Sequence, residues 1–90
     1  MNRDSTSRAL QSQVADCLLR EWDPIGVQEF PEAQDEYDSY VGGIVALLMR
    51  GAVAVELSEH LWRIETERMG LAGDRENAAR VAALLKALAD

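Results

Sequence analysis

The sequence predicts an all-α fold, a compact four-helix domain with short loops. Apolar residues recur every three or four positions in four separate segments, which is the period of an amphipathic helix. No segment alternates apolar and polar residues as a half-buried strand does. Ninety residues suffice for one core, so we expect one helical domain over residues 6–90, after a disordered N-terminus of residues 1–5.

The first helix is expected from about Thr6, with Ser5 or Thr6 as its N-cap. Its apolar positions are Leu10, Val14, Cys17, Leu18 and Trp22. Pro24 ends it, because the residue before a proline is pushed out of the α region. The single cysteine excludes an intramolecular disulfide and is expected to be a buried, reduced thiol.

The second helix begins between Pro31 and Ser39 and runs to Arg50. Its buried face comprises Tyr37, Tyr40, Val41, Ile44, Leu47 and Leu48. The pair Gly42-Gly43 predicts either a kink or the true start of the helix, because glycine disfavours helix interiors. The next helix follows almost at once, so we expect the two to lie antiparallel.

The third helix, residues 53–69, has two apolar stripes. The first comprises Val53, Leu57, Leu61 and Ile64, and the second comprises Val55, Trp62 and Met69. A surface helix needs only one stripe. The second stripe therefore predicts a homodimer interface or a docking patch, unless the first helix covers it with Leu18 and Leu19.

Glycine and aspartate mark the start of the last helix. Gly70 is placed for a left-handed C-cap and Asp74 for an N-cap, with Glu76 in the first turn. Its apolar stripe comprises Ala78, Val81, Ala82, Leu85, Leu88 and Ala89.

The formal charge of −7 argues against nucleic acid and anionic membranes as partners. No segment approaches the roughly 20 apolar residues of a membrane span. Residues 1–12 lack the apolar core of a signal peptide, so we expect a cytoplasmic location.

Residues 21–38, the acidic segment, contain no lysine or arginine. Their seven acids are Glu21, Asp23, Glu29, Glu32, Asp35, Glu36 and Asp38. Four interpretations remain open: solvated loop and helix-start carboxylates, a surface for a basic protein or amine ligand, a hard-cation site, or paired acids for hydrolysis. The spacing of Asp35, Glu36 and Asp38 is not that of a calcium loop.

No cofactor, metal or catalytic motif is expected. His60 is the only histidine, and zinc sites need several histidine or cysteine ligands. No serine stands in a G-x-S-x-G context, and no glycine-rich phosphate loop is present.

Trp22-Asp23-Pro24 predicts a built corner, in which Asp23 accepts from backbone N–H groups just past Pro24 and Trp22 anchors the corner in the core. Such a corner can be structural or can contact a ligand.

Three segments, EWDPIGV (21–27), DEYDSYVGGIVALL (35–48) and LWRIETERMGL (61–71), resemble a bacterial family of short helical domains of unknown function. The motifs are WDP, DEYDxY and IExExMG, matched at Trp22, Asp23, Pro24, Gly26, Asp35, Glu36, Tyr37, Asp38, Tyr40, Glu65, Met69 and Gly70. The resemblance implies an all-α fold and brings no established activity. Relatives with proline at the position of Gly42 imply a helix boundary there.

Glu65 lies between the two apolar stripes and requires hydrogen-bond donors. Tyr37, Tyr40 and the Trp22 indole could supply them, so that the three motifs meet around one polar cluster. This cluster could be a fold-specifying network or a small-ligand pocket.

The leading functional hypothesis is a non-enzymatic protein–protein interaction module that self-associates or binds a basic partner. An immunity or antitoxin-like protein masking a basic effector is a specific version. The alternative is a small ligand-binding domain or enzyme that uses Glu65, Asp23, Asp38 and His60.

Overall fold

The computed structural model describes the backbone of residues 3–89 and the side chains of residues 8–89. Its four main helices are α1 (Arg3–Cys17), α2 (Asp38–Met49), α3 (Ala54–Arg63) and α4 (Arg75–Ala89). Shorter turns are η1 (Leu18–Trp22) and η3 (Ile64–Arg68), both π-helical, and η2 (Pro31–Ala33), a 3₁₀ turn. No strand occurs within residues 3–89, so the predicted all-α, four-helix domain is confirmed.

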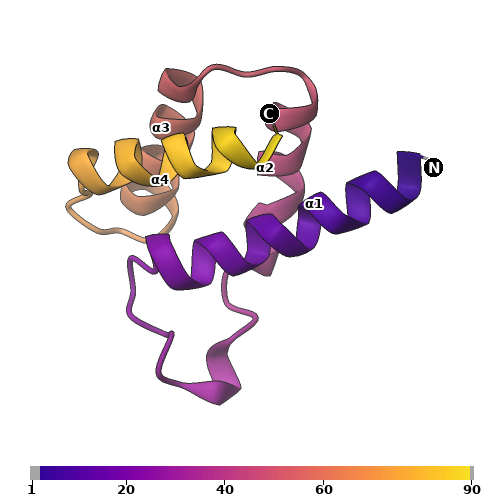
Figure 1. Ribbon diagram of the computed structural model, residues 1–90. Helices are drawn as coiled ribbons and strands as arrows, with labels where there is room; N and C mark the ends of the chain where they lie inside the picture. Colours follow the sequence, from indigo (N-terminus) through magenta and orange to yellow (C-terminus); the bar gives the residue numbers. More distant parts are fainter. Residues whose placement is uncertain (1–2, 90) are drawn as a thin grey trace.

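The helices enclose one core. α1 crosses both α2 and α4, while α3 packs against α4 (Figure 1). The core side chains are Leu10, Val14, Leu18, Trp22, Tyr37, Val41, Ile44, Val45, Leu48, Leu57, Leu61, Ile64, Ala78, Val81, Ala82 and Leu85. The loop between η1 and α2 projects away from the bundle (Figure 1).

α2 and α3 run in opposite directions, as expected from their short connection, although α3 packs most closely against α4 (Figure 1). One expected boundary was wrong. α2 runs without a break through Gly42-Gly43, which is neither its start nor a boundary. Ring atoms of His60 lie near Gly43, where a larger residue would meet that ring.

The first helix begins at Arg3, upstream of the expected start at Thr6, so Ser5 and Thr6 lie inside it. Met1 and Asn2 lie outside the described residues. The predicted caps between α3 and α4 are confirmed. Gly70 has φ +68°, and the Asp74 carboxylate accepts from Asn77 N at 3.0 Å. Within residues 3–89, no helix has the length and apolar character needed to cross a bilayer.

Candidate functional site

Glu65 is almost completely buried, with 2% of its surface exposed, and both of its carboxylate oxygens are bonded. Oε2 accepts from the Trp22 indole N–H at 2.8 Å, and Oε1 accepts from the backbone N–H of Asp74 at 2.8 Å. The expected Trp22 donor is therefore confirmed. This one carboxylate joins the end of η1, the turn η3 and the start of α4. Without these two donors, burying the Glu65 carboxylate would cost free energy of folding.

The two tyrosines take other roles than those expected. The Tyr37 hydroxyl donates to Asp23 Oδ1 at 2.7 Å and accepts from the backbone N–H of Ile25 at 3.2 Å. Tyr40 meets Trp22 edge-on, with ring centroids 6.2 Å apart, and its hydroxyl has no bond to Glu65. Trp22, Asp23, Tyr37 and Glu65 thus form one polar cluster, in which Trp22 bonds Glu65 and Tyr37 bonds Asp23.

Asp23 forms the predicted corner. Its carboxylate accepts from Val27 N at 2.8 Å and Gln28 N at 3.1 Å, and its backbone is left-handed with φ 31°. Burial raises the pKa of Asp23, but the hydrogen bonds from Tyr37, Val27 and Gln28 outweigh burial and hold it below its ordinary 3.8. Asp23 is therefore a charged acceptor of three hydrogen bonds at neutral pH.

The carbonyl groups at the end of η1 are all bonded. Asp23 N donates to Leu18 O, and the Gln28 amide reaches the carbonyls of Leu19 and Arg20. From α4, Arg80 donates to Glu21 O at 2.6 Å and Asn77 to Trp22 O at 3.4 Å. A helix end needs such partners when it packs against protein. Asn77 and Arg80 were not anticipated, because no local pattern reveals a cap supplied by a distant helix.

A cavity of about 360 Å³ opens over the polar cluster. It is lined by Trp22, Asp23, Pro24, Glu65, Leu71, Gly73, Asp74 and Asn77. The carboxylates of Asp23 and Glu65 face it with their oxygens already bonded inside the protein. The protein itself therefore already supplies hydrogen-bond donors to both carboxylates beside the cavity.

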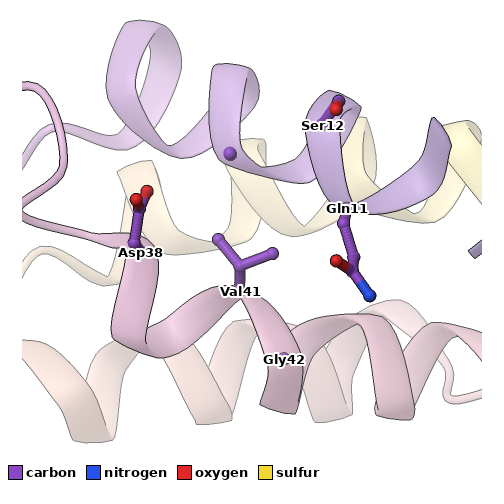
Figure 2. Close-up of a pocket in the computed structure, with 6 residues that line it drawn as sticks. Gln11, Ser12, Asp38, Val41 and Gly42 are labelled. Carbon is purple, nitrogen blue, oxygen red and sulfur yellow. The ribbon is translucent and has the colours of Figure 1, made fainter. Parts of the chain in front are cut away.

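The other two residues of the predicted catalytic or ligand-binding set lie elsewhere. Asp38 is exposed in the first turn of α2 and lines a shallow pocket between α1 and α2 with Gln11, Val41 and others (Figure 2). His60 lines a different pocket, beside Glu56, Glu59 and Arg63. Burial, with Arg68 and Arg63 nearby, lowers the pKa of His60. Asp23 and Glu65 thus share a cavity that contains neither Asp38 nor His60.

The predicted interface stripe of Val55, Trp62 and Met69 does not form one exposed surface. Val55 is 73% exposed, whereas Trp62 and Met69 are partly buried against the core. The stripe was predicted from the 3.6-residue period of an α-helix. Because η3 is a wider, π-helical turn, that period does not extend to Met69. Trp62 is covered by Gly73 and by Arg75, whose guanidinium lies 3.7 Å from the ring centroid.

The described side chains form neither a cluster of metal ligands nor a reactive thiol. No group of three or more histidine, cysteine, aspartate or glutamate residues within residues 8–89 is arranged to hold a metal ion. Cys17 is half-buried, and burial, with Glu21 and Asp16, raises the pKa of its thiol to about 11. The thiol is consequently protonated and a poor nucleophile at neutral pH.

The projecting loop carries the acidic segment and two exposed apolar side chains, Phe30 at 53% and Ile25 at 41%. Side chains hold its backbone in place. The Gln34 amide donates to the carbonyls of Val27, Gln28 and Phe30 at 3.0–3.3 Å. No local pattern in the sequence singles out Gln28 and Gln34, whose side-chain amides bond backbone carbonyls here.

Five carboxylates on or beside this loop have no ion-pair partner among the side chains of residues 8–89: Glu29, Glu32, Asp35, Glu36 and Asp38. They contrast with Glu21, whose carboxylate pairs with Arg80 at 2.9 Å. Comparison with protein-family models, curated proteins and solved structures finds no match to this chain, so the family resemblance of its motifs stays a prediction.

Proposed function

We propose that this chain is a cytoplasmic, non-enzymatic interaction module that binds a basic partner protein through its acidic segment. The observation that carries the proposal is the exposure of Phe30 and Ile25 on a loop bordered by unpaired carboxylates. An exposed aromatic side chain supplies an apolar anchor, and the surrounding charge selects a basic partner and speeds its approach.

The bonding of the loop supports this proposal further. Asp23 and Gln34 bond its backbone at several points, and the Gln28 amide ties it to the end of η1, so its conformation exists before any partner arrives. A surface that is ordered in advance loses less conformational entropy on binding. An immunity or antitoxin-like protein that masks a basic effector is one specific form of this function.

A second candidate is small-ligand binding in the cavity over the polar cluster, favoured by its volume of about 360 Å³ and its two carboxylates. The burial of Glu65 makes this the weaker candidate, because only 2% of its surface is exposed and both of its oxygens already accept hydrogen bonds from within the protein.

Isothermal titration calorimetry with a synthetic amphipathic helix of leucine and lysine tests the proposal. We expect binding that weakens with added salt, because exposed charges are screened. Phe30→Ser should weaken it by about tenfold or more, as loss of an interface anchor does. Val55→Ser, at another exposed apolar position, is the matched control and should bind as the wild type does. Equal affinity for Phe30→Ser, or for a peptide with glutamate in place of lysine, would overturn the proposal.

A further inference from the structure

Gly42 lies in the interior of α2, where neither the backbone nor the packing requires a glycine. Its φ is not positive, and a glycine inside a helix costs about 1 kcal/mol of stability relative to alanine. An added Cβ at Gly42 would meet no atom within 4 Å, whereas one at Gly43 would meet the His60 ring at 3.7 Å. The backbone of Gly42 is therefore bare beside open space, which another molecule can approach closely.

That space is a pocket of about 370 Å³ between α1 and α2, which we call the α1–α2 pocket. Figure 2 shows the side chains of Gln11, Val41 and Asp38 pointing into the space between the two helices. Three residues of each helix line the pocket: Gln11, Ser12 and Ala15 of α1, and Asp38, Val41 and Gly42 of α2. The pocket thus combines an apolar floor on α2 with a carboxylate at one end.

Asp38 gives this pocket its charge. Among the side chains of residues 8–89, it is the only charged one that lines the pocket, and it has no ion-pair partner there. The dipole of α2 favours an acid in the first turn, which accounts for Asp38 but not for the opening at Gly42.

The chemistry of the pocket selects a cationic side chain over other occupants. Asp38 would repel an anion. A neutral apolar group would take water from the carboxylate without replacing its hydrogen bonds. A basic side chain satisfies both features, because its methylene stem can lie along Val41 and Gly42 while its charge meets Asp38.

We propose that the α1–α2 pocket receives a lysine or arginine side chain of the basic partner, with Asp38 as its counter-ion and Gly42 as the open floor beneath its stem. The pocket extends the binding surface of the proposed function, on which this inference rests. Asp38 is the last residue of the acidic segment and the first residue of α2. The pocket is therefore continuous with the surface that is proposed to bind the partner.

Filling the pocket tests this inference, by isothermal titration calorimetry with the same leucine–lysine helix. Gly42→Leu fills the pocket and leaves every acid in place, so binding should weaken by about tenfold, as for a blocked anchor site. Urea melts should show Gly42→Leu to be at least as stable as the wild type, because leucine favours a helix and its Cβ meets no atom. Ala83→Leu, at an exposed position of α4, is the matched control and should bind as the wild type does.

Removing the counter-ion is the second test. Asp38→Asn should weaken binding by about fivefold or more, because it leaves a basic side chain in the pocket without its charge partner. Asp35→Asn removes the same charge from the exposed loop outside the pocket, and should weaken binding by about twofold or less.

The outcomes separate this inference from the proposed function. Phe30→Ser weakening binding while Gly42→Leu binds as the wild type does would overturn the pocket and leave the function standing. Equal losses for Asp38→Asn and Asp35→Asn would do the same. A lower stability of Gly42→Leu would also contradict the inference, since it would show that the space at Gly42 is already filled. Absence of binding by the wild type would overturn both.

Discussion

The indole N–H of Trp22 donates to Glu65 Oε2 at 2.8 Å, across 43 positions of the sequence. The other oxygen of the same carboxylate holds the backbone N–H of Asp74, at the N-cap of α4. Three elements that are distant in the sequence therefore meet at one buried carboxylate. The π-helical turns η1 and η3 contribute Trp22 and Glu65 respectively, and this pair links the two turns.

Removing this carboxylate should destabilise the fold. Glu65→Ala leaves the buried Trp22 N–H unpaired, whereas the Asp74 N–H lies close enough to the surface to find water. We expect the free energy of unfolding to fall by about 1–3 kcal/mol, the cost of an unpaired buried donor. Urea melts measure this loss. Glu67→Ala, exposed in the same turn, should change stability by less than about 0.5 kcal/mol. Matching midpoints for the two variants would show that Glu65 is not a structural residue.

The corner at Asp23 should make stability depend on pH. Because the folded pKa of Asp23 lies below the ordinary 3.8, its carboxylate adds stability that is present above 3.8 and is lost as the pH falls through the folded pKa. Asp23→Asn should lower stability by about 1–2 kcal/mol near neutral pH, since a carboxylate accepts stronger hydrogen bonds than an amide. The difference from wild type should shrink in urea melts below pH 3.8.

Asp35→Asn is the control for this comparison. Asp35 is exposed, and its carboxylate has no hydrogen bond among the described residues. The stability of Asp35→Asn should differ little from that of the wild type at every pH. A difference between wild type and Asp23→Asn that stays constant on acidification would contradict the assigned bonding of Asp23.

Gly73 should be intolerant of any side chain. Its φ is +86°, and an added Cβ would lie 2.6 Å from Trp62 Nε1 and 2.8 Å from Thr66 Cγ2. Gly26 also has a positive φ, +68°, but an added Cβ there meets nothing within 4 Å. Gly73→Ala and Gly26→Ala should each lose roughly 1–2 kcal/mol of stability, because alanine disfavours the left-handed backbone conformation. Gly73→Ala should lose a further 1–3 kcal/mol or so from overpacking. Thermal melts showing equal losses would contradict the close packing of Gly73 on Trp62.

The helices were predictable because their signals are local. Apolar spacing marks all four helices, and the caps at Gly70 and Asp74 depend on neighbouring residues alone. Glu65 was also identifiable, since a carboxylate between two apolar stripes must find donors, and tryptophan is a donor that is readily buried. The Trp22 indole is the donor that this requirement predicted.

Other features depend on tertiary contacts and leave no local pattern. The π-helical turn at η3 removes Met69 from the stripe that its spacing suggested, and Arg75 covers Trp62 from the next helix. Arg80 and Asn77 bond the end of η1 from a helix that begins more than fifty positions later. The Tyr37 hydroxyl donates to Asp23 instead of Glu65, and this choice of acceptor likewise depends on how the corner packs.

Metal should have no effect on stability. The acids of the projecting loop have poor ligand spacing, and His60 lies apart from them in another pocket. A ligand that binds only the native state raises the thermal midpoint. We expect the same midpoint in chelator and in millimolar calcium, magnesium or zinc. A reproducible rise with one of these cations would identify a metal site that the described side chains do not reveal.

The central claim is that the polar cluster holds the fold together while the projecting loop binds the partner. Two-dimensional amide NMR during titration with the leucine–lysine helix tests both halves at once. We predict shifts at residues 25–36, with the Trp22 indole N–H and the Asp74 amide unmoved, because Glu65 keeps both bonds. Shifts of those two N–H signals with the Phe30 amide unchanged would contradict the claim and assign binding to the cavity over Glu65.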